Sequence, residues 1–379
     1  MASVACGGAR APADPPGAVS VPEIRVEGAD LGSLFEPAHL VAPEGDAVVD
    51  ELLASPVLRD PEFQAAVTVW IDYWQRLAKP WFPDFLRRMG SYETTVDSAL
   101  AERRLPASLR FLPLIESGYS PSASSHASAV GMWQFMAGTA GEFGMEVGPF
   151  LDERRNPYKS TEAAADFLEE LHGDFGSWFL ALAAYNGGPN RARRILRSYA
   201  PVAEPSDSVF WALRRHWPIE TREFVPKLIA AVIVGGTPER YGYAGAERNP
   251  PLRFDVVTVP DGTTFDVLAA SAEVEEREIH TLNPELFRGF TPPGRSVPVR
   301  VPQGTAETFA RNYAEIPPDE RMTVLEHFVA AGETLSHIAV RYGISLADLQ
   351  AANPAVRPRF LRVGARLTVP IALRRRATG

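Results

Sequence analysis

Glu116 is the residue whose setting first points to chemistry. It stands in "LPLIESGYSP", where a carboxylate follows a run of apolar residues and precedes Ser117 and Gly118. Pro106 can begin a helix and Gly118 can end it, which places Glu116 in the last turn. Unpaired carbonyls make the potential negative there, and apolar neighbours add desolvation, so the carboxyl should bind its proton tightly. A general acid that protonates a leaving oxygen near neutral pH needs this property.

A lone glutamate at a helix end is more often a solvated polar residue, so Glu116 alone decides little. Other carboxylates follow in "DERR" (Asp152 to Arg155), where we expect a structural role that ties a loop to a helix starting at Ser160. The seven histidines are dispersed and show no zinc-site spacing. We therefore expect neither a metal nor another cofactor.

Length and charge limit the classes of function. A chain of 379 residues suits two or three domains. The formal net charge is −9, and no basic run with interleaved aromatic residues occurs, which argues against nucleic acid as the main partner. No apolar stretch is long enough to cross a bilayer.

Cys6 is the single cysteine, so an internal disulfide is excluded. Its setting, "SVACGGARAPADPPGA", resembles a bacterial lipoprotein cleavage site, in which the cysteine carries the lipid. The alternative is a stray thiol in a disordered tail, because the basic and apolar regions of a signal peptide are missing and Ser3 stands where leucine is usual. Both interpretations stay open.

Helical stripes and a repeat define the elements around Glu116. Residues 1–45 are rich in Pro, Gly and Ala and predict a flexible lead, whereas 46–248 show helical periodicity. One apolar face is made by residues spaced three or four apart: Phe63, Val67, Trp70 and Trp74. The helix that begins at Ser160 has a good N-cap there, and "WFLALAAYNGG" ends on a usual helix stop.

The carboxyl third contains one unit twice, at a constant offset of 70 residues. Each copy predicts a strand, two helices and a closing strand, which gives modules at 249–303 and 326–372 joined by a linker helix within 304–325. The paired positions are Val259 and Val329, Gly262 and Gly332, Thr264 and Thr334, Ala269 and Ala339, Asn283 and Asn353, Pro284 and Pro354, and Gly294 and Gly364.

Four separated motifs occur in a fixed order: "LPLIESGYSPSASSHASAVGMWQFMAGTA", "DERRNPYKSTEAAADFLEEL", "LAAYNGGPNRARRIL" and "IETREFVPKLIAAVI". Over roughly residues 50–240 they resemble lytic murein transglycosylases of the soluble-lytic type, closest to the membrane-bound D-type branch. "VAAGETLSHIAVRYGISLADLQAANP" is similar to a LysM module, and the copy near Val257 resembles a degenerate one. The resemblance implies a mainly α, lysozyme-like catalytic domain followed by small α+β modules.

The resemblance also implies site residues. Glu116 would be the sole catalytic acid and base, and the adjacent Ser117 would complete the family's "ES" motif. The remaining expected substrate-binding residues are Ser125, Met132, Gln134, Met136, Tyr185, Asn186, Glu220 and Phe224. Trp133 and Phe135 are expected in the core. In the second LysM module the expected glycan contacts are Gly332, Glu333, Thr334, Leu335, Asn353 and Pro354.

Two positions depart from the family pattern. Ser128 stands where glycine is usual, and it would stiffen its loop. Phe224 stands where tyrosine is usual, and it cannot donate a hydrogen bond, so turnover would fall if that hydroxyl orients the acid.

With one convincing carboxylate instead of the usual flanking pair, the substrate must help. The family solution is cleavage between MurNAc and GlcNAc of peptidoglycan with formation of 1,6-anhydro-MurNAc. A hydrolytic muramidase on the same fold and a non-catalytic wall-binding protein are the alternatives. Glycan strands would be the partner, no nucleic acid is expected, and the location would be the cell envelope, periplasmic or tethered to the outer membrane through Cys6.

Overall fold

The computed structural model describes residues 50–370 except 149, 261, 293–294, 318–323 and 343. Cys6 and the expected flexible lead lie outside the described residues. Two compact units divide the chain, one within residues 1–145 and 157–251 and the other within 146–156 and 252–379. The short stretch 146–156 therefore belongs with the carboxyl-terminal unit, although it lies inside the sequence range expected for the helical domain.

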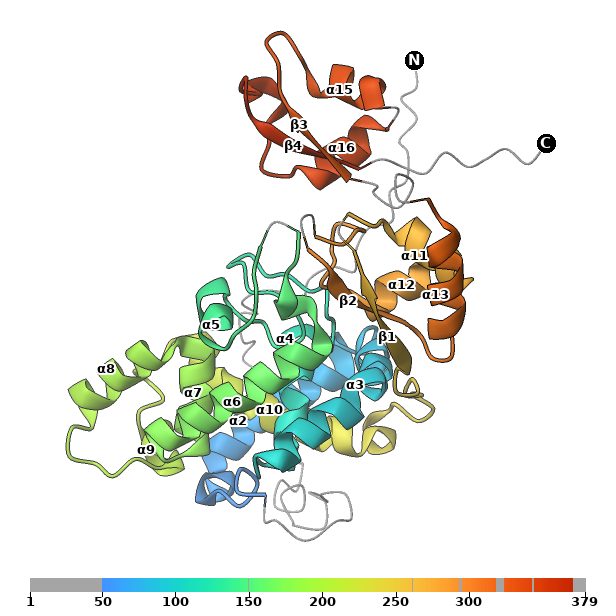
Figure 1. Ribbon diagram of the computed structural model, residues 1–379. Coiled ribbons are helices and arrows are strands. Elements are labelled where there is room, and N and C mark those ends of the chain that lie inside the picture. Colours follow the sequence, from blue (N-terminus) through green and yellow to red (C-terminus); the bar gives the residue numbers. More distant parts are fainter. Residues whose placement is uncertain are drawn as a thin grey trace, which may run out of the picture. The chain divides into compact units, whose positions relative to one another are not determined.

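The first unit is built from helices (Figure 1). Its α-helices are α2 (Pro61–Asp72), α3 (Phe82–Glu102), α4 (Leu112–Ser117), α5 (Ala137–Glu142), α6 (Pro157–Phe175), α7 (Trp178–Gly187), α8 (Pro189–Tyr199), α9 (Asp207–Ala212) and α10 (Ile219–Gly236). Shorter turns are η2 (Pro56–Arg59), the π-helical η3 (Tyr73–Leu77), η4 (Ala107–Phe111) and η6 (Pro238–Tyr241).

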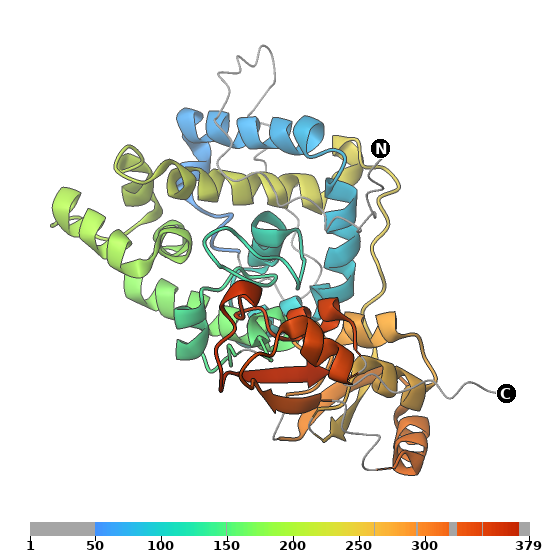
Figure 2. The ribbon, with the colours of Figure 1, turned by 90° about the horizontal axis from the view of Figure 1, so that it is seen from above.

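Helices α2 and α10 lie side by side and form much of the core (Figures 1 and 2). Helix α2 begins where the Asp60 carboxylate accepts hydrogen bonds from the amides of Glu62 and Phe63. The predicted apolar face is confirmed, because Phe63, Val67 and Trp74 are buried. Trp70 lies at its edge, half-buried, where its Nε1 donates to Glu223 at 3.2 Å.

The start of helix α6 differs from the expectation. Ser160 is expected as the N-cap, but the helix begins at Pro157, and Ser160 is fully buried inside its first turn. Proline suits the first helical position, because its ring fixes φ and no amide hydrogen needs a partner there. Helix α7 ends at Gly187, as the Asn and paired Gly predict.

The second unit contains two modules with the same order of elements. The first pairs β1 (Phe254–Val259) with β2 (Val297–Pro302) antiparallel, and between them lie α11 (Phe265–Ala272) and α12 (Glu276–Leu282). The second pairs β3 (Val324–Phe328) with β4 (Arg366–Pro370), and between them lie α15 (Leu335–Tyr342) and α16 (Leu346–Ala352). The helices of the two copies correspond at an offset of 70 residues, so the predicted repeat is confirmed.

Three smaller elements complete this unit: η5 (Glu153–Arg155), the linker helix α13 (Ala306–Glu315) and η7 (Pro358–Phe360). Each module has its own apolar core, centred on Phe265 and Val299 in the first and on Ile338 and Leu367 in the second. The expected class, a mainly α domain with small α+β modules, is thus confirmed. Within the described residues, no helix combines the length and apolarity needed to span a membrane.

Candidate active site

Glu116 lies in the last turn of α4, as predicted, but the helix does not begin at Pro106 as one α-helix. Residues 107–111 form the 3₁₀ turn η4, and α4 follows from Leu112. Pro113 explains the division, because a proline nitrogen cannot donate to the carbonyl four residues before it. The helix ends at Gly118, whose φ of 59° lies in the left-handed region that glycine favours.

Gly118 is required by space as well as by conformation. A Cβ atom there would meet the ring of Phe85 at 2.5 Å, inside contact distance. The Gly118 carbonyl accepts a hydrogen bond from Nε of Arg88 at 2.7 Å. Helix α3, which carries both Phe85 and Arg88, therefore holds the residue at which α4 ends.

Three further hydrogen bonds hold the chain on either side of Glu116. Lys227 of α10 donates from Nζ to the Ile115 carbonyl at 2.9 Å. The Ser117 hydroxyl donates to the Met132 carbonyl at 2.8 Å. The Tyr119 hydroxyl donates to the Arg110 carbonyl at 2.6 Å. These contacts reach three separate parts of the fold, so the backbone that carries Glu116 has little freedom to move.

Burial raises the pKa of Glu116 to about 7. Desolvation is the largest cause, the positive charge of Lys227 opposes it, and the negative charge of Glu220 adds to it. The side chain is still partly exposed at the surface. Glu116 can therefore be reached from solvent while holding a proton near neutral pH, as a general acid must.

Tyr185 of helix α7 lies near enough to Glu116 for the two groups to interact electrostatically. Its hydroxyl donates to the Trp133 carbonyl at 2.7 Å, and burial together with the charge of Glu116 raises its pKa well above the usual range. The next residue, Asn186, accepts at Oδ1 from the Thr221 hydroxyl at 2.8 Å. Glu220, which precedes Thr221, is exposed. The fold thus brings Glu116, Tyr185, Asn186 and Glu220 into one neighbourhood.

The turn between α4 and α5 carries the other predicted residues. An isolated bridge joins Val130 and Phe135, and the Gln134 side chain donates to the Gly131 carbonyl at 2.8 Å. Gln134 has a φ of 52°. Ser125 lies earlier in the same turn, where its hydroxyl accepts a hydrogen bond from the Ala129 amide at 3.1 Å. Gln134 and Ser125 are both half-buried and retain access to solvent.

Burial separates the predicted contacts into two groups. Met136 is 47% exposed and can meet a ligand. Met132 is fully buried and Phe224 is 4% exposed, so their side chains pack in the core, and the expectation that they touch substrate is not supported. Trp133 is also fully buried, as expected, and its Nε1 donates to Thr161 at 2.9 Å.

Ser128 has a φ of 67°. A side chain is disfavoured in this left-handed region, which explains physically why glycine is the usual residue there. The departure noted in the sequence is therefore a point of local backbone strain in the loop between α4 and α5.

The second LysM-like module requires a correction. Asn353 is buried, its Nδ2 donates to the carbonyls of Leu349 and Thr368, and its Oδ1 accepts from the Thr368 amide. Its amide is fully used inside the module, as is that of Asn283 in the first copy. Leu335 is 3% exposed and belongs to the core. Neither Asn353 nor Leu335 presents its side chain to a glycan.

The other expected LysM contacts lie on or near the surface. Glu333 accepts from the Ala330 amide and pairs with His327 at 2.7 Å, and Thr334 accepts from the His337 amide at the start of α15. Gly332 has a φ of 84°. Of the expected glycan contacts, Gly332, Thr334 and Pro354 are exposed.

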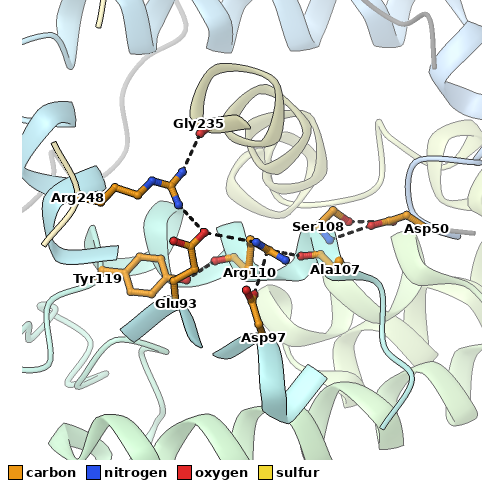
Figure 3. A network of polar contacts seen from close by, with 9 residues as sticks. All are labelled: Asp50, Glu93, Asp97, Ala107, Ser108, Arg110, Tyr119, Gly235 and Arg248. Atoms are coloured by element: carbon orange, nitrogen blue, oxygen red, sulfur yellow. Dashed lines mark hydrogen bonds and ion pairs between the residues drawn. The ribbon is translucent and has the colours of Figure 1, made fainter. Parts of the chain in front are cut away.

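A polar network surrounds Arg110 of η4 (Figure 3). Arg110 forms ion pairs with Glu93 at 3.3 Å and Asp97 at 3.1 Å, and Arg248 joins Glu93 to the Gly235 carbonyl. Burial raises the pKa of Asp97 to about 6, against the opposing charge of Arg110. Because Tyr119 bonds to the Arg110 backbone, this network supports the turn that follows Glu116.

Lys227 is the site residue that sequence reasoning missed. The available signal was a single cation inside the apolar run "FVPKLIAAVIV". Among the described residues, no group of His, Cys, Asp and Glu is arranged to hold a metal ion.

Comparison with known proteins assigns a class to this fold and site. Residues 96–204 match the transglycosylase SLT domain, 253–318 match the LysM-like domain of lytic transglycosylase MltD, and 327–370 match the LysM domain. The chain therefore belongs to the lytic transglycosylase family that combines an SLT domain with LysM-type modules.

The chain is also similar to individual proteins. The chain is 30% identical over 304 residues to membrane-bound lytic murein transglycosylase D of Escherichia coli strain K12, and the match covers 77% of this chain and 66% of the relative. It thus spans slightly less than two thirds of that protein. Among solved structures, the soluble lytic transglycosylase SLT70 of Escherichia coli is 22% identical, with 47% of this chain and 30% of that chain covered and a TM-score of 0.35. An inactive mutant of lytic transglycosylase Slt from Pseudomonas aeruginosa is 23% identical over 40% of this chain and 25% of that chain, with a TM-score of 0.33.

Proposed function

We propose that this protein is a lytic transglycosylase that cleaves the MurNAc-β-1,4-GlcNAc bond of peptidoglycan and leaves 1,6-anhydro-MurNAc ends. The observation that carries the proposal is Glu116 itself, a carboxyl with a pKa of about 7 at the end of a tightly held helix, beside Tyr185. The matched SLT domain and the similarity to a murein transglycosylase support the same substrate class.

The reaction needs one group that acts first as acid and then as base. Protonated Glu116 gives its proton to the glycosidic oxygen, the bond from C1 of MurNAc breaks, and the GlcNAc alcohol leaves. The Glu116 carboxylate then takes the proton from the C6 hydroxyl of the same MurNAc while that oxygen bonds to C1. The glutamic acid is regenerated and no water is consumed. A pKa near the working pH serves both steps, because neither protonation state is strongly disfavoured.

The other residues of the neighbourhood would bind and orient the sugars. The Asn186 amide, held at Oδ1 by Thr221, keeps its Nδ2 hydrogens for an acetamido oxygen. Gln134, Ser125 and Met136 would line the groove, and Glu220 would hold a neighbouring saccharide. The LysM module would retain glycan strands through its exposed residues Gly332, Thr334 and Pro354.

Hydrolysis is the alternative, and Glu220 is the observation that favours it, since this second carboxylate acts electrostatically on Glu116. A glycosidase with two carboxylates could activate water. Purified sacculi should be digested and the released muropeptides weighed by mass spectrometry. Anhydro ends, lighter by one water than reducing ends, would support transglycosylation. Reducing ends would instead establish a muramidase.

A non-catalytic wall-binding protein is the third possibility, and one substitution separates it from both enzymes. Glu116→Gln should lower the release of soluble fragments by about 10²- to 10⁴-fold, because the general acid is lost. Glu169→Gln, at an exposed position of α6, is the matched control and should leave the rate unchanged. If the unsubstituted protein binds sacculi without releasing fragments, the enzymatic proposal fails.

The proposed location is the cell envelope. Similarity to a relative described as membrane-bound supports it, and a peptidoglycan substrate, as proposed above, would be found there. Acylation of Cys6 would provide a tether to the outer membrane. Metabolic labelling with a radioactive or clickable fatty acid, compared with Cys6→Ala, would test this attachment.

A further inference from the structure

We infer that Lys227 is a positioning residue that sets the protonation of Glu116 by placing a fixed positive charge beside the end of α4. Only the catalytic consequence of this inference rests on the proposed function. The effect of Lys227 on the protonation of Glu116 can be measured without substrate. The geometric basis is the hydrogen bond of 2.9 Å from Nζ to the Ile115 carbonyl, the residue directly before Glu116.

The surroundings of Lys227 hold its ammonium in place. Nζ lies 5.6 Å from the ring centre of Trp70 and 6.0 Å from that of Trp74, both within the range of cation–π attraction. These rings come from α2 and η3, whereas the hydrogen-bond acceptor belongs to α4. Lys227 itself follows Pro226 in α10, so four elements (α2, η3, α4 and α10) meet at this single charge.

Lysine supplies a compact positive charge beside the end of α4. The sequence has only three lysines, Lys79, Lys159 and Lys227, among 38 basic residues, and the other two are exposed. Lysine is a compact charge whose pKa shifts readily on burial, whereas arginine remains charged. Burial lowers the pKa of Lys227, while the charges of Glu116 and Glu220 oppose that change.

The charged and titratable groups that act on Glu116 come from two helices. Lys227 and Glu220 belong to α10 and have opposite effects, and Tyr185 of α7 interacts with the ionised form. Without the cation, desolvation and Glu220 would act together and the carboxyl would bind its proton more tightly. Glu116 would then be a weaker acid for the leaving oxygen in the first step, although its carboxylate would be a stronger base in the second step. Lys227 therefore balances the two roles of one carboxyl.

Three substitutions separate charge from hydrogen bonding. Lys227→Arg keeps both, Lys227→Gln keeps a donor for Ile115 but loses the charge, and Lys227→Met loses both. Lys79→Met is the control at an exposed lysine. Glu116 should be followed in each variant by carbon NMR of the labelled carboxyl across a pH titration, with Glu116→Gln used to assign its signal.

We expect the Glu116 titration midpoint to rise by about one pH unit in Lys227→Gln and Lys227→Met, and to stay near 7 in Lys227→Arg and Lys79→Met. If Lys227→Met does not fold, Lys227→Gln alone decides. An unchanged midpoint in Lys227→Gln would overturn the inference, whatever the activity of the protein.

The pH dependence of cleavage provides the second measurement. In Lys227→Gln, the alkaline limb of the pH–rate profile should move to higher pH and kcat should fall. Lys227→Arg should have the pH profile and the kcat of the unsubstituted protein. A uniform loss of rate with no movement of the limb would assign Lys227 a structural role only. If the unsubstituted protein does not cleave sacculi but the NMR midpoint moves, the proposed function fails and the electrostatic inference stands.

Discussion

The Tyr119 hydroxyl donates a hydrogen bond of 2.6 Å to the carbonyl of Arg110, so the two ends of the segment that carries Glu116 are tied together. Tyr119 is fully buried and has a φ of 59°, a conformation that a side chain rarely adopts. Directly before it, Gly118 has the same φ. Two successive left-handed residues turn the chain back toward Arg110, and the hydrogen bond helps to hold that turn.

Tyr119→Phe should lower the free energy of unfolding by about 1–2 kcal/mol, because the Arg110 carbonyl loses a buried partner. Urea unfolding of both proteins would measure the difference. Tyr199→Phe is the matched control, since Tyr199 is 55% exposed and its change should stay within about 0.5 kcal/mol. Equal effects at both tyrosines would mean that the hydrogen bond does not stabilise the turn.

Gly118→Ala should destabilise the protein and reduce cleavage together. The added Cβ would lie 2.5 Å from the Phe85 ring, and overpacking of this kind costs about 1–3 kcal/mol in addition to the strain of a positive φ. Gly144→Ala isolates the strain, because Gly144 has a φ of 72° but a Cβ added there would have no neighbouring atom within 4 Å. Chemical denaturation should show a larger loss for Gly118→Ala, and a smaller one would argue against the steric role of Phe85.

The proton on Glu116 links stability to pH. Its pKa is about 7 in the folded chain and 4.5 ordinarily, so between these values the folded state binds a proton that the unfolded state has released. Stability from this group is therefore complete below about pH 4.5 and is lost as the pH rises to about 7. One pKa unit corresponds to about 1.4 kcal/mol, so the shift from 4.5 to about 7 sets an upper limit of about 3–4 kcal/mol on this contribution to the free energy of unfolding.

Glu116→Gln removes this dependence, because glutamine cannot ionise. The variant should match the unsubstituted protein near pH 4.5 and unfold at a higher temperature at pH 8. Thermal unfolding followed by circular dichroism at both pH values would measure the difference. A variant that is less stable at pH 8 would contradict the raised pKa of Glu116.

The two equivalent asparagines should act as structural residues of their modules. Asn353→Ala and Asn283→Ala each remove three hydrogen bonds to the backbone, and we expect a loss of about 2–4 kcal/mol for each module. Differential scanning calorimetry of the full chain would report it. Asn190→Ala, at an exposed position, serves as the control. If Asn353→Ala weakens sacculus binding while its module keeps full stability, Asn353 is a glycan contact after all.

Local patterns in the sequence were sufficient for several helices and for the order of elements in the repeated modules. Steps of three and four residues placed Phe63, Val67 and Trp74 on one buried face, and the offset of 70 residues placed the helices of both modules. Glu116 was also found this way, since an apolar run ended by glycine is a local signal of a helix end. The start of α6 was misplaced because Ser160 and Pro157 are both good starting residues, and the choice between them depends on packing.

The electrostatic environment of Glu116 was decided by tertiary structure alone. Lys227 lies 112 positions further along the chain than Ile115, yet its ammonium reaches that carbonyl because α10 packs beside α4. No sequence period encodes such a meeting, since it depends on how helices far apart in the chain pack together. Packing also explains why two methionines four residues apart differ in burial. Met132 is buried, whereas Met136 is exposed. Residue type and spacing set which groups could act, and burial and long-range packing set the charge and proton each one holds.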